Sequence, residues 1–447
     1  MSLLERVAGR IDVRRLFLTL VSRGLSTVFS FALIISLARV LPAAEYGLYA
    51  LLFSIASALG LVLTSGQTTL VVKHLHREDL PGDLNNQLLV ARNVKWQAIA
   101  AGIAWVAGLS AVASGLGPLQ SGAVLAVLIF ASVFMASEYF QSYFRARNQL
   151  KLALIPRENF WRPFATAAIW MAVLSGLSLN GENALILVAA CLALAVALQA
   201  HFFVRDARHR YQKPAEPGKV EPTASTWNRE SVYFGLNGLM TAVALHIEVV
   251  IVGFVLGLEE VALFFVLFRL AMLLNLPQIS METYAMPMVA ERLREGDRHG
   301  AQQILSAFAV VTFVLSLIGT AILVPLSPYV VKIFNPAFEV SPLLMLAVAS
   351  QTVVMAFFGL GTSTLMISGG ERFFLIYRSF LYAVYAAALV LFGWLGGLMG
   401  IALTMAGFVL IEHVFAAVWC RREAKVDITA TGAIRAFTAK GTQLPAD

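Results

Sequence analysis

Charged residues are scarce in this sequence: 13% of its 447 residues are Asp, Glu, Lys or Arg, whereas 59% are hydrophobic. A soluble domain carries about a quarter charged residues, so the composition excludes an ordinary water-soluble protein. A helix that crosses a bilayer needs about 20 mostly apolar residues, and the chain offers such runs one after another. We therefore expect an all-α polytopic membrane protein.

Residues for metal, redox or nucleotide chemistry are also nearly missing. Cys191 and Cys420 are the only cysteines, too few for a disulfide framework, and no Cys/His cluster has the spacing of metal ligands. No glycine-rich phosphate loop is present. We expect no metal, no cofactor and no catalytic residue, and movement of any cargo would be driven by an ion gradient or be passive.

Twelve spans account for the hydrophobic runs. They are predicted near residues 16–40, 46–65, 96–113, 121–144, 159–179, 184–204, 232–256, 261–289, 303–324, 342–364, 375–393 and 397–419. Loops on the cytoplasmic side gather Lys and Arg, and with both termini inside this topology places 29 of the 33 basic residues on that side. The formal charge of +7 is thus a topology signal and no sign of nucleic-acid binding.

A polar, proline-containing stretch divides the chain near its middle. It predicts a cytoplasmic linker over 205–231 between six-helix bundles at 1–204 and 232–419, followed by a cytoplasmic tail over 420–447. The halves resemble each other: Leu41–Phe53 aligns with Leu256–Phe268 at an offset of 215, and Leu154–Arg157 aligns with Leu375–Arg378 at an offset of 221. Six spans per half make the repeat parallel, and substrate sites of such transporters lie between the repeats.

Several of these segments resemble one transporter family. The stretch LARVLPAAEYGLYALL after the first span, Ser65-Gly66-Gln67, and Pro325–Leu344 are similar to polysaccharide flippases of the Wzx type, in the multidrug/oligosaccharidyl-lipid/polysaccharide exporter superfamily. Pro42 and Ala262 depart from the glycines usual there. The resemblance implies two pseudo-symmetric six-helix bundles (MATE-like) in a bacterial inner membrane. It also implies alternating access on an undecaprenyl-diphosphate-linked glycan, coupling to H⁺ or Na⁺, and contacts with membrane lipids and polysaccharide-assembly proteins.

Arginines within the spans are the first candidates for a binding site. Arg23 lies toward the cytoplasmic end of span 1, and Arg269 lies near the middle of span 8. A guanidinium binds phosphate in bidentate fashion and keeps its charge, so both suit a diphosphate headgroup. Each could instead pair with a buried carboxylate or reach the interface and only hold helices together.

Carboxylates within the spans are candidates for the coupling ion. Glu138 in span 4 shares a helix face with polar residues, and Glu248 lies in span 7. An ion pair of Glu248 with Arg269 is the structural alternative, because it lowers both burial costs. Pro277 removes a backbone hydrogen bond in span 8 and predicts a bend there, which is either a gate or a simple kink.

Three functions compete on these residues. Arginines within spans favour an anionic headgroup, and hence a lipid-linked oligosaccharide flippase. A multidrug antiporter of the same superfamily would need a carboxylate-lined lumen poor in Arg. A membrane enzyme such as a glycan polymerase would need sizeable outer loops, which this chain lacks.

Overall fold

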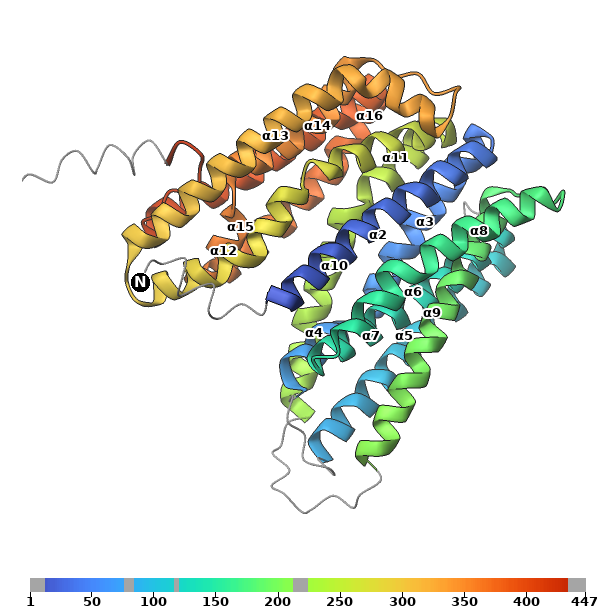
Figure 1. Ribbon diagram of the computed structural model, residues 1–447, viewed down its shortest axis with the longest axis horizontal. Coiled ribbons are helices and arrows are strands. Elements are labelled where there is room, and N and C mark those ends of the chain that lie inside the picture. Colours follow the sequence, from blue (N-terminus) through green and yellow to red (C-terminus); the bar gives the residue numbers. More distant parts are fainter. Residues whose placement is uncertain (1–12, 76–83, 116–119, 212–223, 433–447) are drawn as a thin grey trace, which may run out of the picture. The chain divides into compact units, whose positions relative to one another are not determined.

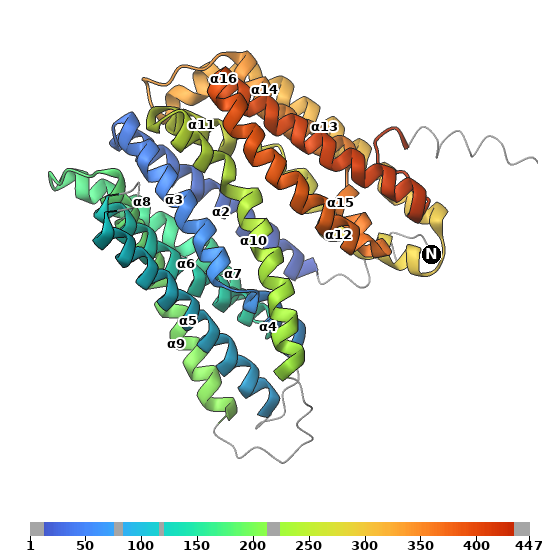
Figure 2. The same cartoon turned by 180° about the vertical axis from the view of Figure 1, so that it is seen from behind.

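The computed structural model describes residues 13–75, 84–115, 120–211 and 224–432, and every regular element in these ranges is a helix. Figures 1 and 2 show the ribbon from opposite sides. The chain divides into two compact units, Met1–Val250 and Ile251–Asp447. The predicted all-α fold is confirmed.

The first unit has three long helices at its centre. Its elements are α2 (Val13–Val40), α3 (Ala43–Leu63), α4 (Gln67–His74), α5 (Leu84–Ser114), α6 (Ser121–Ala146), α7 (Leu150–Leu154), the π-helix η1 (Ile155–Phe160), α8 (Trp161–Leu174), α9 (Gly181–Tyr211) and most of α10 (Ala224–Val255). Helices α3, α6 and α9 pack against one another, and α2 packs along η1 and α8. This packing places η1 between α2 and the central helices.

The second unit is built around α13, α14 and α16. Its elements are α11 (Leu258–Leu273), α12 (Leu276–Arg294), α13 (Arg298–Phe334), α14 (Pro342–Phe358), α15 (Gly361–Leu365), the π-helix η2 (Met366–Gly370), α16 (Glu371–Trp419) and the π-helix η3 (Cys420–Ala424). Helix α16 turns back on itself at Gly397, whose φ of 57° and ψ of −146° are not helical. It therefore forms two antiparallel legs, one on each side of this glycine.

Each of the twelve predicted spans falls on one helix, on one leg of α16 or on two consecutive helices. By length and composition alone, seven helices in the described part of the chain qualify as membrane spans, or nine when α11/α12 and α14/α15 each count as one bent span. The difference from twelve has three sources. Helix α2 contributes only a shorter apolar helix, Gly24–Val40. Helix α8 has only 14 residues. Helix α16 counts as one span by this criterion although it has two legs.

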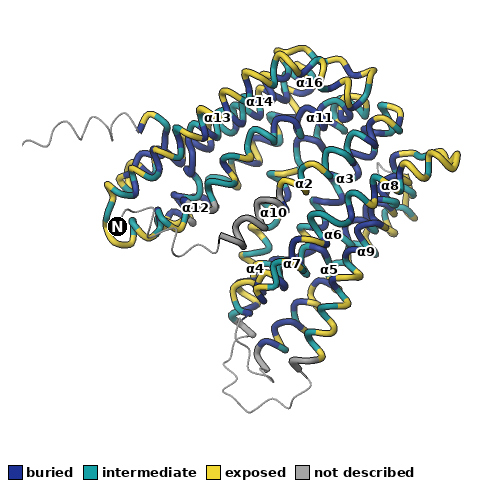
Figure 3. Tube along the Cα trace, in the orientation of Figure 1, coloured by how far each residue is buried: buried dark blue, intermediate teal, exposed yellow. Residues whose placement is uncertain are grey.

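Exposed apolar side chains mark the faces that a bilayer would cover. Helix α5 is the clearest case, because only 6% of its most apolar 18-residue stretch is buried within the protein. Exposed turns recur along this helix in Figure 3. In water such a surface would be strongly unfavourable, whereas against lipid tails it is not. The protein is therefore a multi-pass membrane protein.

The turn between the first two spans is tied to a distant helix. Glu45 follows this turn, and its Oε2 accepts a hydrogen bond of 2.7 Å from the backbone N–H of Gly181, the first residue of α9. A carboxylate at a helix N-terminus binds an unsatisfied N–H and opposes the helix dipole. Glu45, the glutamate of the LPAAEYGLY stretch, thus links α3 to the N-terminus of α9 through this hydrogen bond.

Helices occupy both ends of the predicted linker over 205–231. Helix α9 continues to Tyr211 and α10 begins at Ala224, while residues 212–223 lie outside the described residues. The start of the predicted tail, from Cys420 to Gly432, is described and packs into the second unit; the rest of it is outside the description.

Candidate functional site

Four charged side chains meet in the first unit where η1 packs against α6. Arg157 of η1 donates through Nη2 to Glu138 of α6, and through Nη1 to Gln141 Oε1 at 2.8 Å and to Glu158 Oε1 at 3.1 Å. Arg162 lies one turn further, with its Nη1 3.7 Å from Glu158 Oε2. We call Glu138, Arg157, Glu158 and Arg162 the four-charge cluster.

Helix α2 closes the cluster with hydroxyl groups. Ser26 Oγ donates to Glu158 Oε2 at 3.1 Å and accepts from Arg162 Nη1 at 2.8 Å. Ser22 Oγ accepts from the side-chain amide of Asn159 at 2.8 Å. Both serines are buried. They lie one position before Arg23 and Thr27 in the sequence.

The charges of the cluster balance within a small volume. Two guanidinium and two carboxylate groups lie together, each side chain 17–21% exposed. Arg157 also lies over the ring of Phe134, with Cζ 5.5 Å from its centroid. A single buried charge is costly unless paired, so mutual pairing explains how all four are kept among helices. Glu138, predicted to bind a coupling ion, binds Arg157 here.

A π-helix positions the central arginine. Element η1 contains Pro156 in its first turn, and π-helical turns are frequent at functional sites because their wider turn shifts side chains out of the α-helical pattern. Here it carries Arg157 toward α6 and Glu158 toward α2.

A second arginine pair lies in the second unit. Arg378 Nε is 3.0 Å from Glu412 Oε1, which joins the two legs of α16. The guanidinium lies over two rings, with Cζ 4.9 Å from the Phe374 centroid and 5.3 Å from that of Tyr382. Arg378 and Arg157 occupy matching places in the predicted internal repeat. In each predicted half, an arginine near the start of the fifth predicted span thus binds a carboxylate.

The predicted headgroup arginines differ in how far the structure describes them. Arg269 lies on the largely buried α11, with Cζ 4.8 Å from the centroid of Phe265. Arg23 lies on α2, and its side chain is outside the description. Glu248 is buried on α10, in the first unit, whereas Arg269 is in the second, so their pairing stays a prediction.

The bend expected at Pro277 is present. Helix α11 ends at Leu273 and α12 begins at Leu276 with Pro277 in its first turn, and the two axes differ by 47°. A second bend of 41° separates α14 from α15. The gating role of Pro277 stays a prediction.

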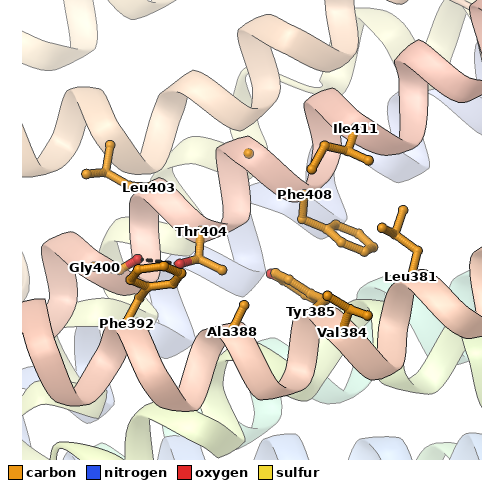
Figure 4. Close-up of a pocket in the computed structure, with 11 residues that line it drawn as sticks. Leu381, Val384, Tyr385, Ala388, Phe392, Gly400, Leu403, Thr404, Phe408 and Ile411 are labelled. Atoms are coloured by element: carbon orange, nitrogen blue, oxygen red, sulfur yellow. Dashed lines mark hydrogen bonds between the residues drawn. The ribbon is translucent and has the colours of Figure 1, made fainter.

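An apolar groove runs between the two legs of α16 (Figure 4). It has a volume of about 410 Å³ and is lined mainly by apolar side chains of both legs, Tyr385 and Phe408 among them. Their rings stack with centroids 4.0 Å apart.

Within the described residues, no three His, Cys, Asp or Glu side chains are grouped so that they could hold a metal ion.

Sequence and structure comparisons fit this architecture. Residues 13–293 match the family described as "Polysaccharide biosynthesis protein", and no curated protein matches the chain. The fold is similar to an inward-facing multidrug resistance MATE family transporter of the MOP superfamily, with 14% identity, a TM-score of 0.64, and coverage of 94% of this chain and 96% of that chain.

Two further solved structures share the fold. One is a MATE protein in a bent conformation, with 15% identity, a TM-score of 0.57 and 94% of each chain covered. The other is a MOP superfamily transporter from Pyrococcus furiosus, with 14% identity, a TM-score of 0.54 and 96% of each chain covered. The resemblance read from the sequence is thereby confirmed. The chain belongs to the polysaccharide biosynthesis protein family, and its fold is that of the MOP superfamily transporters.

Proposed function

We propose that the protein is a flippase that moves an undecaprenyl-diphosphate-linked oligosaccharide across a bacterial inner membrane by alternating access, with both termini in the cytoplasm. The family match over residues 13–293 carries this proposal. Arginines held among the spans support it, because a guanidinium binds a phosphate in bidentate fashion. Arg269 and Arg23 are the proposed headgroup ligands.

The four-charge cluster offers a route for coupling to H⁺ or Na⁺. Glu138 already binds Arg157, so it takes up a cation only when the guanidinium turns away. A phosphate that binds Arg157 frees the carboxylate of Glu138 for that cation, because one guanidinium edge serves one bidentate anion at a time. Glu248 is the second candidate for the coupling ion.

Multidrug antiport is the second candidate function, since a solved transporter of this fold is a multidrug resistance protein. A site for organic cations needs carboxylates open to the cargo. The carboxylates Glu138, Glu158 and Glu412 bind arginines instead, which favours the anionic substrate.

Reconstitution in proteoliposomes tests the proposal. The probe is a fluorescent undecaprenyl-diphosphate oligosaccharide, and its movement between leaflets is followed by a quencher outside. We expect movement above that of empty liposomes without nucleotide. Exchange of an organic cation such as ethidium for protons, with no movement of the lipid probe, would establish the antiporter instead.

The same assay tests Arg269. We expect Arg269→Lys to lose most transport, since a point charge cannot replace the planar fork, and Arg269→Ala to abolish it at near wild-type membrane levels. Recovery of transport and expression in Arg269→Ala/Glu248→Ala would instead assign the arginine to helix packing, because no charge is left unpaired in that variant.

A further inference from the structure

Three side-chain hydrogen bonds join the two bent spans of the second unit, α11/α12 and α14/α15, at matching positions along their lengths. Before the bends, Thr352 Oγ1 donates to Ala271 O at 3.5 Å. At the bends, Gln278 Nε2 donates to Gly359 O at 3.0 Å. Beyond them, Ser363 donates to Glu282. Each pair is 81 residues apart, so the spans run parallel with their bends side by side.

A short segment outside the helices packs against the α14–α15 bend. Residues Val426–Ala430, here called the strap, follow η3 after the last span. Val426 and Ile428 are 2% and 0% exposed, and they join the apolar cluster that contains Phe358, Leu360 and Leu365. The strap thus buries its apolar side chains against the residues on either side of the α14–α15 bend.

Polar contacts fix the strap to α13 and η3. The backbone N–H of Asp427 donates to Gln302 Oε1, and Gln302 Nε2 donates to Asp427 O, both at 2.6 Å. The Asp427 carboxylate accepts from Arg421 Nη2 at 2.9 Å and from Thr429 Oγ1 at 2.7 Å. One side chain of α13 therefore satisfies both backbone groups of a buried residue.

The strap contacts both sides of the bend. On the α14 side, the backbone N–H of Ala430 donates to Phe357 O at 2.8 Å. On the α15 side, Ile428 packs so closely on Gly361 that a Cβ there would lie 2.6 Å from Ile428 Cδ1. Gly359, which accepts from Gln278, lies between these two contacts.

We propose that the strap is a latch that holds the α14–α15 span in its bent form. Its release removes the contacts that bridge the bend, and the span straightens. The α11/α12 span follows, because Gln278 and Glu282 bind it in register to its neighbour. Release is reversible, since a short segment opens at a small fraction of the global unfolding free energy.

Amide hydrogen exchange of the full chain in lipid nanodiscs tests the latch without any transport assay. Ile428→Asp places a charge in the apolar cluster and releases the strap. We expect amides of 359–370 and of 274–282 to exchange about tenfold faster than in the wild type, with α5 unchanged. Arg422→Ala, an exposed change beside the strap, is the matched control and should leave both segments at wild-type protection.

Two further variants make the test specific. Gln302→Ala removes both backbone contacts of Asp427 while leaving the apolar cluster intact, so it reports on the latch if Ile428→Asp fails to fold. Gln278→Leu and Ser363→Ala together remove both bonds that couple the spans at and beyond the bends, so combined with Ile428→Asp they should confine the faster exchange to 359–370. Faster exchange limited to residues 425–432, with both bends as protected as in the wild type, would overturn the proposal.

Discussion

At the residue scale, the four-charge cluster is held by reciprocal pairing. Arg157 has three acceptors on two elements, and Glu158 receives hydrogen bonds from α2 as well as from Gln141 of α6. Removing one member leaves its partly buried partner with an uncompensated charge. The pairs are therefore expected to act as a unit and not as separate bonds.

A double-mutant cycle on Glu138 and Arg157 measures this dependence. We expect Arg157→Ala and Glu138→Ala each to lower the thermal stability in detergent, and the double variant to lose less than the sum. The coupling should be about 1–3 kcal/mol, as for residues of one network. Lys151→Ala, which removes an exposed cation of α7, is the control. Additive losses would contradict a coupled cluster.

Sequence reasoning identified Glu138 but missed Arg157 and Arg378 as partners of carboxylates. Both arginines lie near span ends and were counted as loop charges, because position along the chain does not reveal that η1 folds back against α2 and α6. A signal was present nonetheless. The matching stretches Leu154–Arg157 and Leu375–Arg378 place an arginine at the same point of each half.

At the element scale, two glycines with similar backbone angles allow the stability cost of an unusual backbone conformation to be distinguished from the cost of tight packing. Gly359 has φ 53° and ψ −117°, and Gly397 has φ 57° and ψ −146°. A Cβ on Gly359 would lie 3.0 Å from Ala309 Cβ, whereas none lies within 4 Å at Gly397. Both alanine variants bear the cost of a sparsely populated backbone conformation with positive φ, about 1–3 kcal/mol.

Only Gly359→Ala adds a steric clash with α13 to this cost. We expect it to lower the midpoint of thermal unfolding further than Gly397→Ala does. Equal losses would show that α13 yields freely at this contact, and that only the backbone conformation matters at the α14–α15 bend.

The strap should loosen in acid. Burial by itself would raise the pKa of Asp427, but hydrogen bonds from Thr429 and the Arg421 guanidinium hold this pKa below its ordinary value of 3.8. A lowered pKa in the folded state stabilises the fold above the unfolded value, and this contribution is lost as the pH falls through the folded value.

Thermal melting of the wild type and of Asp427→Asn between pH 7 and pH 3 measures the effect. The wild type should be the more stable of the two down to about pH 4, and its advantage should shrink below that. An advantage that stays constant throughout would mean that the carboxylate charge does not stabilise the strap.

The two bends differ in how well the sequence predicts them. Pro277 removes a backbone donor, so the bend before α12 could be read from the residue itself. The span over 342–364 has no internal proline after Pro342 and reads as one continuous apolar run. At its bend, Gly359 accepts a hydrogen bond from Gln278 and lies close to Ala309, and those contacts exist only after the second unit has folded.

At the scale of the whole molecule, apolar composition and the spacing of polar interruptions were sufficient to predict an all-helical membrane fold. They could not reveal the strap, because a short polar segment with two apolar residues, Val426 and Ile428, looks like any surface segment. Its burial comes from the apolar cluster to which α12, α13, α14, α15 and α16 all contribute.

Orientation in the membrane is predicted from the basic residues and can be measured directly. Ser225→Cys should react with an impermeant maleimide only after the inner face is opened, because residue 225, at the start of α10, lies in the linker that is predicted to be cytoplasmic. Cys191 and Cys420 are buried and give the background in the parent protein. Labelling at position 225 in intact cells would place this residue outside and would contradict the predicted topology.

The turn at Gly397 also decides where the protein accepts foreign sequence. The last two spans are joined almost without a loop, so an epitope inserted there would separate the two legs of α16 and break the ion pair of Arg378 with Glu412. Residues Asn335–Ser341, between α13 and α14, form a true connecting segment with exposed positions. A tag for antibody detection or a fusion partner for cryo-microscopy therefore belongs at this connection.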